Sequence, residues 1–340
     1  RNAAPRAVYE SQLTGSFTKS HVGNLFKGSG AYIDTAPNIM DVLVVDEAHR
    51  LNEKSGLYQN KGENQIKEII QAAKITIFFV DQDQRVTLKD IGEKKEIRRW
   101  ADACGANVTE LKLESQFRCN GSDGYLAWVD HALKIGESAT DNLDGINYDF
   151  RVCSSPNELY DLISMRNIVA NKARLVAGYC WDWKGKKNPE IKDIVIPEHD
   201  FAMRWNLGSD GSLWIISPQS VNEIGCIHTC QGLELDYVGV IIGPDFVIRD
   251  GVAVTDATQR SSQDRSIHGF KKMLKEEPDK ALALTERIIK NTYRTLMTRG
   301  QKGCYLFCTD AETNAYFRKF VDQAILGTES IDERKAADVD

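Results

Sequence analysis

The stretch Asp41-Val-Leu-Val-Val-Asp-Glu-Ala-His-Arg50 decides the fold of this chain. Its four consecutive apolar residues, three of them valine, predict a strand buried on both faces. The strand delivers two adjacent carboxylates, Asp46 and Glu47, to its carboxyl end, the edge where open α/β sheets bind ligands. Such a pair suits nucleotide hydrolysis, in which one carboxylate holds Mg²⁺ through water and the other orients the attacking water. The alternative is a buried strand that merely ends in polar residues.

The composition is that of a globular protein and excludes several other classes. The chain has 340 residues, enough for two domains, of which 42% are hydrophobic and 27% charged. It contains no membrane-spanning apolar run and no signal-peptide pattern, so we expect a cytoplasmic protein with no membrane partner. Eight scattered cysteines favour reduced, core-filling thiols over a zinc site. The net charge of −6 argues against a nucleic-acid coat protein, but not against a motor with one basic channel.

Alternating strand and helix patterns predict a mixed α/β fold. Strand patterns at 39–45 and 75–80 flank an amphipathic helix at 63–74, which implies parallel strands. We further expect helices at 93–103, 123–133, 156–171, 267–276 and 279–297, strands at 108–113, 173–180, 213–216, 237–242 and 303–308, and an inserted loop or hairpin at 181–206. The sequence therefore predicts two α/β lobes with mostly parallel sheets, within 1–118 and 119–325, and a polar tail at 326–340.

Two polar motifs follow the first lobe's strands. Asp81-Gln-Asp-Gln84 ends the strand pattern at 75–80, and Gln84 can hydrogen-bond both a terminal phosphate and the attacking water. A solvated loop after a core strand is the alternative for this motif. Leu113-Glu-Ser-Gln-Phe-Arg118 places an arginine where the two lobes join.

Two more motifs lie in the second lobe. In Gly225-Cys-Ile-His-Thr-Cys-Gln-Gly-Leu-Glu234, Gly232 permits close backbone approach and Glu234 can reach a ribose or a neighbouring turn. Tyr293-Arg-Thr-Leu-Met-Thr-Arg-Gly300 ends the last long helix, and an arginine there can stabilise transition-state charge on a γ-phosphate. For any single arginine, a surface ion pair is the alternative.

Trp181 and Trp183 alternate with Asp182, so both can point the same way from a strand end. Stacking on unpaired bases is one interpretation, and burial under the second sheet is the more common role of such residues. The basic run 184–187 can track phosphates or lie in a solvated loop.

These motifs, in this order, resemble those of superfamily 1 helicases of the UvrD/Rep type. Asp46-Glu47 is similar to their Walker B pair, Asp81-Gln-Asp-Gln84 to motif III, Ser115-Gln-Phe-Arg118 to motif IV, 227–236 to motif V and Thr298-Arg299 to motif VI. A closer resemblance is to a bacterial helicase-like P-loop family related to the helicase domain of Schlafen proteins, carried by Val176-Ala-Gly-Tyr-Cys-Trp-Asp-Trp183, His228-Thr-Cys-Gln-Gly-Leu-Glu234, 236–243 and 291–300.

The resemblance implies two RecA-like lobes that bind ATP and Mg²⁺ and act on single-stranded DNA or RNA. It assigns roles by matching positions: Asp46 serves Mg²⁺, Glu47 is the general base, and Gln84 senses the γ-phosphate. It makes Arg118 and Arg299 arginine fingers, with Arg294 as the alternative to Arg299, and it places Gly232 and Glu234 near nucleotide and His228 and Thr229 on the nucleic-acid track. Val80 and Gln231 depart from the family pattern, so hydrolysis is the firmer prediction and unwinding the weaker one.

No Gly-x-x-x-x-Gly-Lys-Ser/Thr phosphate loop occurs in the sequence. We therefore expect a fragment of a longer ATPase, with an incomplete first lobe and negligible turnover of its own. The leading hypothesis is a helicase-like motor on single strands. The alternative is a regulatory ATPase switch that controls an associated effector such as a nuclease, without unwinding. A non-enzymatic binding module is the third hypothesis, disfavoured by the intact acidic pair and arginines.

Overall fold

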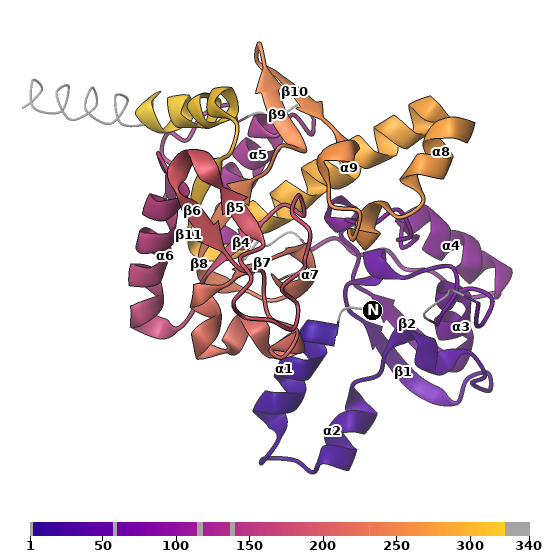
Figure 1. The fold of residues 1–340 in the computed structure, drawn as a ribbon. Helices are drawn as coiled ribbons and strands as arrows, with labels where there is room; N and C mark the ends of the chain where they lie inside the picture. Colours follow the sequence, from indigo (N-terminus) through magenta and orange to yellow (C-terminus); the bar gives the residue numbers. More distant parts are fainter. Residues whose placement is uncertain (1–2, 57–59, 114–117, 137–139, 231, 324–340) are drawn as a thin grey trace, which may run out of the picture. The chain divides into compact units, whose positions relative to one another are not determined.

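The computed structural model describes residues 3–56, 60–113, 118–136, 140–230 and 232–323, with the backbone alone for Ala3, Ala4, Arg118 and Asn120. These residues belong to two compact units (Figure 1). Unit 1 comprises Arg1–Leu113 and Arg265–Lys271, and unit 2 comprises Glu114–Asp264 and Lys272–Asp340. Within the described residues, no helix is both long enough and apolar enough to cross a membrane.

Unit 1 contains a parallel strand pair covered on one face by helices. The elements are α1 (Ala3–Leu13), α2 (Lys19–Leu25), β1 (Met40–Val45), α3 (Gln65–Ala72), β2 (Ala73–Phe78) and α4 (Lys94–Ala103). Strands β1 and β2 pair in parallel, with Val42 opposite Ile75, as the β-α-β pattern predicted. The side chain of Asn64 caps α3 by accepting the backbone N–H groups of Ile66 and Lys67. This cap fixes the start of the helix that covers the strands.

The prediction that β1 is buried on both faces was wrong. Alternate residues of the pair are exposed on one face: Val42, Val44, Ile75 and Ile77, with Phe79 just beyond β2. Helix α3 and the short helix Ala48–Arg50 contribute Ile66, Ile69, Ala48 and Leu51 to the core on the other face. Parallel strands are normally covered on both faces, so this apolar face lacks a cover among the described residues.

The predicted strand at 108–113 was also wrong, because these residues form no regular element. Leu111 and Leu113 are 85% and 79% exposed. Within the described parts of the chain, no strand pairs with these residues, and an unpaired strand gains neither hydrogen bonds nor burial.

Unit 2 contains a five-stranded, all-parallel sheet, which confirms the predicted α/β class. The strand order is β3-β11-β8-β4-β7. The strands are β3 (Asp149–Val152), β4 (Ala173–Ala177), β7 (Ile224–Gly225), β8 (Leu235–Ile242) and β11 (Gly300–Cys308). The helices are α5 (Asp123–Ala132), α6 (Pro156–Ala170), α7 (Ile227–Cys230), α8 (Phe270–Glu276) and α9 (Pro278–Met297). The first two residues of α8 belong to unit 1. Helix α6 begins after the Ser155 side-chain cap and ends at Asn171 in the left-handed conformation.

Two hairpins extend unit 2. The predicted insertion contains β5 (Ile194–Ile196) and β6 (Phe201–Met203), paired antiparallel. A second hairpin joins β9 (Phe246–Arg249) to β10 (Val252–Thr255) through Asp250 and Gly251, both at positive φ. The predicted strand at 213–216 was wrong, because Gly211–Ile216 forms a 3₁₀ helix that buries Trp214.

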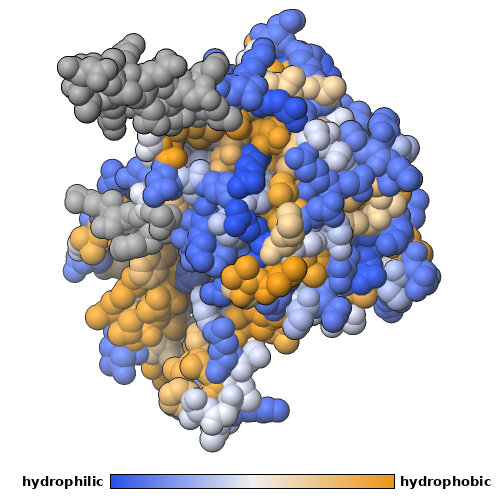
Figure 2. Space-filling model, turned by 90° about the vertical axis from the view of Figure 1, so that its left-hand side faces the viewer, coloured by the Kyte–Doolittle hydropathy of each residue, from blue (hydrophilic) through white to orange (hydrophobic). Residues whose placement is uncertain are grey.

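Figure 2, which faces the side where α6 lies in Figure 1, shows hydrophobic residues between the hydrophilic ones on the surface.

Candidate functional site

The acidic pair lies where β1 ends, in a turn held by the end of β2. Asp46 Oδ1 accepts the backbone N–H of Glu47 at 2.9 Å, and Glu47 adopts the left-handed conformation with φ 52°. The N–H of Phe79 donates to Val45 O, and the N–H of Ala48 donates to Phe79 O, both at 2.9 Å. The turn that presents both carboxylates is therefore tied to the strand end that carries the glutamine motif.

His49 joins the acidic pair to that motif. Its Nε2 lies 3.1 Å from Glu47 Oε2, and its Nδ1 accepts the backbone N–H of Asp81 at 3.4 Å. Because Nδ1 accepts, a neutral ring carries its proton on Nε2, the nitrogen that lies near the Glu47 carboxylate. His49 is only 1% exposed. The sequence analysis assigned it no role, although it stands two residues after Glu47.

Gln84 closes the network. Its Nε2 donates to Asp81 Oδ2 at 2.6 Å, and the residue is 1% exposed. Glu47, His49, Asp81 and Gln84 thus form one connected set across two strand ends, in which His49 contacts the Asp81 backbone N–H and Gln84 the Asp81 carboxylate. We call this set the acidic network. The predicted base and the predicted sensor glutamine are brought together in unit 1.

Gly92 allows the backbone to lie directly on this turn. A Cβ atom built at Gly92 would be 1.9 Å from Ala48 O and 2.6 Å from the Cα of His49. Any side chain there would displace the backbone between Glu47 and Arg50, so this close approach requires glycine.

The donor chemistry of the acidic pair, Asp46 and Glu47, fits Mg²⁺ bound with a nucleotide. Mg²⁺ prefers oxygen ligands and usually takes one or two carboxylates together with substrate phosphates and waters. Asp46 is an exposed carboxylate and Glu47 is a partly buried one beside it. The described residues hold no group of three or more His, Cys, Asp or Glu side chains that would make an all-protein metal cage.

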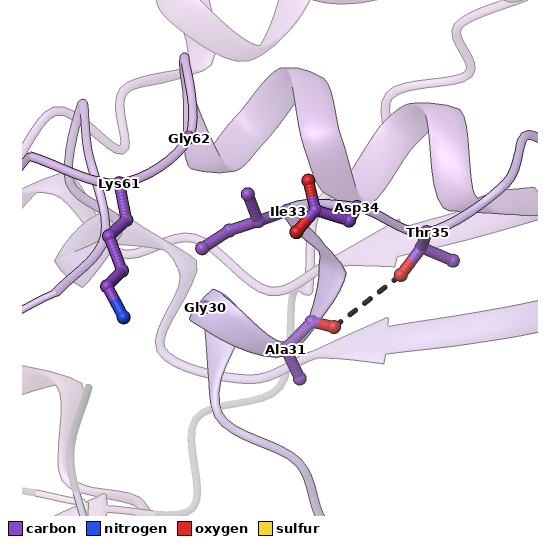
Figure 3. Close-up of a pocket in the computed structure, with 7 residues that line it drawn as sticks. All are labelled: Gly30, Ala31, Ile33, Asp34, Thr35, Lys61 and Gly62. Carbon is purple, nitrogen blue, oxygen red and sulfur yellow. Dashed lines mark hydrogen bonds between the residues drawn. The ribbon is translucent and has the colours of Figure 1, made fainter.

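A separate pocket of about 560 Å³ lies elsewhere in unit 1. Figure 3 shows the Lys61 side chain and Gly62 on one side, facing the segment that carries Gly30 and Asp34. None of its lining residues belongs to the acidic network.

In unit 2, the predicted nucleotide-facing residues lie at the amino ends of β8 and β11. Arg299 is 2% exposed; its Nε donates to Thr295 O at 3.1 Å and its Nη1 to Leu233 O at 3.4 Å. Leu233 follows Gly232, whose φ is +82°. The guanidinium of Arg299 is therefore packed against the Gly232–Glu234 turn, with Glu234 itself exposed.

Arg294 lies in a different environment. Its guanidinium pairs with the Asp130 carboxylate of α5 through Nε and Nη2, and Nη2 lies 3.1 Å from Oδ2. This two-bond ion pair joins α9 to α5, whereas Arg299 donates to backbone carbonyl groups. The side chain of Arg118 lies outside the described residues, as do Ser115, Gln116, Phe117 and Gln231.

His228 and Thr229 lie in α7, directly after β7. The Thr229 hydroxyl accepts the N–H of Cys226 at 2.9 Å and donates to its carbonyl at 2.8 Å, so it stabilises its own turn. The His228 ring is partly exposed, with Nε2 3.9 Å from Asp264 Oδ1, and its centroid is 6.5 Å from that of Tyr179, which follows β4.

Trp181 and Trp183 also follow β4, and both are partly buried against the core of unit 2. Trp181 O accepts the indole N–H of Trp205 at 3.1 Å. The Lys186 ammonium lies 5.0 Å from the centre of the Trp183 ring, a cation–π contact.

The two predicted sets in unit 2 thus lie toward opposite ends of parallel strands. Gly232, Glu234 and Arg299 precede β8 and β11. In the other set, His228 and Thr229 follow β7, and Trp181 and Trp183 follow β4. Strand β8 has eight residues, so its ends are about 23 Å apart.

Comparison with known proteins gives two matches. The profile of the family described as Schlafen group 3, DNA/RNA helicase domain, matches residues 1–310. The Saccharomyces cerevisiae protein named Uncharacterized protein YPL245W is 24% identical over 306 residues, which is 80% of this chain. The chain spans 63% of the length of that relative.

Proposed function

Because the chain belongs to the Schlafen group 3 DNA/RNA helicase domain family, we propose that it is the larger part of a helicase-like ATPase that acts on single-stranded nucleic acid. The motif resemblance to superfamily 1 helicases gives the residue roles. The observation that carries the proposal is the acidic network, because it joins the predicted base, Glu47, to the predicted sensor, Gln84, through His49.

In this proposal Asp46 holds the hydration shell of Mg²⁺, whose charge neutralises the phosphates of ATP when both are bound. Glu47 takes a proton from the attacking water, and the Nε2–H of His49 orients the Glu47 carboxylate. Gln84 reports the γ-phosphate to this base through Asp81 and His49. Arg299, backed by Arg118, supplies positive charge to the transition state, with Gly232 and Glu234 beside the nucleotide.

We infer that the phosphate loop belongs to a further segment that covers the exposed face of β1 and β2. Val42, Val44, Ile75 and Ile77 are between 44% and 63% exposed, and parallel sheets are rarely left open on an apolar face. A strand–loop–helix segment would cover that face and bring backbone N–H groups to the strand ends that carry Asp46 and Glu47. The 340-residue chain alone would then bind ATP weakly and hydrolyse it negligibly.

The alternative, a regulatory ATPase switch acting on an effector such as a nuclease, has two observations in its favour. The Thr229 hydroxyl is used within its own turn, and Trp183 faces Lys186 and the core. Both groups would have to rearrange to contact nucleic acid.

The deciding experiment is ATP hydrolysis by the longer protein, with and without single-stranded DNA or RNA. Stimulation by single strands is the result expected of a nucleic-acid motor. Robust hydrolysis that is indifferent to nucleic acid would favour the switch. No hydrolysis under either condition would overturn both.

A further inference from the structure

Residues 260–264 form a short segment of unit 2 that we call the clasp, with three of its five residues buried. Arg260, Ser261 and Asp264 are between 4% and 6% exposed. Arg260 Nε lies 2.7 Å from Asp264 Oδ2 and 3.7 Å from Asp245 Oδ2. Burial raises the pKa of Asp245, while for Arg260 the two carboxylates outweigh burial and raise its pKa. The Arg260 guanidinium therefore stays charged and fixes Asp264 in place.

The clasp holds the residues that follow β4. The Ser261 hydroxyl donates to Asp182 Oδ1 at 2.6 Å, and the Ser261 N–H donates to Tyr179 O at 2.9 Å. Gln263 Oε1 accepts the backbone N–H of Trp183 at 2.8 Å. The Trp183 backbone is thus bound between the core and the clasp.

The clasp also faces the predicted nucleic-acid histidine. Asp264 Oδ1 lies 3.9 Å from His228 Nε2, so the carboxylate faces the ring. One five-residue segment therefore contacts both α7 and the residues after β4, which are far apart in sequence.

The chain enters unit 1 directly after the clasp. Residues Arg265–Lys271 belong to unit 1, where Ser266 is fully buried and its carbonyl accepts the N–H of Leu88 at 2.7 Å. Leu88 is four residues beyond Gln84, and Ser266 is only two positions after Asp264, a reach of at most about 7 Å. So short a connection cannot absorb much movement of the loop after Gln84.

We propose that the clasp is a positioning element that carries the state of the Gln84 loop to His228 and Trp183, so that nucleotide occupancy sets how unit 2 holds a single strand. This rests on the proposed function. Ser261, Gln263 and Asp264 do not contact nucleotide in this proposal, and they act through Asp182, Trp183 and His228.

The test compares matched substitutions in the longer protein. Ser261→Ala removes the hydroxyl that donates to Asp182 and accepts the N–H of Gln263, and Gln263→Ala removes the acceptor of the Trp183 N–H. The controls are Ser262→Ala, at an exposed position within the segment, and Gln259→Ala, at an exposed position just before it. Asp264→Asn keeps the volume and removes the charge that faces His228. Binding of a fluorescein-labelled oligothymidylate is measured by anisotropy with ADP and with a non-hydrolysable ATP analogue, alongside basal and stimulated hydrolysis.

We expect wild type and controls to bind the oligonucleotide with different Kd values in the two nucleotide states. In the clasp variants that difference should shrink by roughly 3- to 20-fold, with basal hydrolysis retained. A clasp variant that folds and keeps the full nucleotide dependence would overturn the clasp proposal alone. A wild-type protein that neither binds oligonucleotide nor hydrolyses ATP would overturn the proposed function, and the clasp proposal with it.

Discussion

His49 Nε2 lies 3.1 Å from Glu47 Oε2, while its other ring nitrogen accepts the N–H of Asp81. A single buried imidazole thus binds two turns that follow different strands. This geometry makes the histidine an orienting group for the carboxylate and a reporter of the position of the neighbouring turn.

Glu47→Gln in the longer protein should lower kcat by at least about 100-fold while ATP binding persists, because the amide cannot take a proton. His49→Ala should lower kcat less, by about 10-fold, since it removes the orientation and keeps the base. Steady-state hydrolysis and fluorescent-nucleotide binding measure the two effects. His21→Ala, an exposed histidine of α2, is the control, and an unchanged kcat in Glu47→Gln would remove Glu47 from the mechanism.

Arg299 and Arg294 should respond differently to substitution. Arg299→Lys should reduce turnover by about 1,000-fold with binding retained, as expected for an arginine finger. Arg294→Ala removes the two-bond pair with Asp130 and should lower the free energy of unfolding by about 1–3 kcal/mol. Urea unfolding and hydrolysis rates separate the two results. If Arg294 variants fold normally and lose turnover, the roles are reversed.

Gly92→Ala should destabilise unit 1 by about 1–3 kcal/mol, because the new methyl group collides with the backbone after Glu47. Gly23→Ala in α2 is the control: its Cβ would meet nothing within 4 Å. Gly23→Ala should leave the free energy of unfolding unchanged or raise it by about 0.5–1 kcal/mol, because alanine favours the helical conformation more than glycine does. Equal unfolding midpoints for the two variants would contradict the close approach.

Val44→Lys tests the inferred cover over β1. In the present chain Val44 is 63% exposed, so the lysine should change the free energy of unfolding by less than about 0.5 kcal/mol. In the longer protein it should cost at least about 2 kcal/mol, because the covering segment would bury the charge. Val252→Lys in β10, also 63% exposed, should be mild in both. A mild effect of Val44→Lys in both proteins would show that the face stays open.

Acid should weaken the contact between Asp310 and Arg249. Hydrogen bonds from Arg249 lower the pKa of Asp310 from 3.8 to about 2. Because the folded-state pKa is the lower one, this stabilisation is present above about pH 4 and is lost as the pH falls toward 2. Asp310→Asn should therefore differ from wild type in urea unfolding at neutral pH and converge with it in acid. Asp102→Asn, exposed on α4, controls for loss of a surface carboxylate, and a constant difference would exclude the ion pair.

The sequence predicted elements whose signals are local. The β1-α3-β2 unit, the Ser155 cap of α6 and the strands β8 and β11 carry their own periodicity and capping residues. The hairpin turn at Asp250-Gly251 has an equally local signal, an Asp-Gly pair between apolar runs, which the sequence analysis overlooked.

The remaining features depend on distant partners. Residues 108–113 have strand-like alternation, but none of the strands that the structure describes pairs with them, and the two-residue β7 is defined by its pairing with β4. The prediction that β1 is buried on both faces failed for the same reason, because the segments that cover a strand lie elsewhere in the sequence. In the site, neither the contact of His49 with Asp81 nor that of Asp264 with His228 can be inferred from spacing alone.

Strand β8 separates Glu234 at its start from Gly243 at its end, and it is hydrogen-bonded to a neighbour on each side. Such a strand is rigid along its length: it can tilt together with its sheet, but its two ends cannot move closer together or farther apart. A conformational change at one end of β8 can therefore affect the other end only if the whole sheet rotates or if segments outside the sheet transmit the change. The five-stranded sheet of unit 2 thus keeps the distance between Glu234 and Gly243 constant while it rotates as one body.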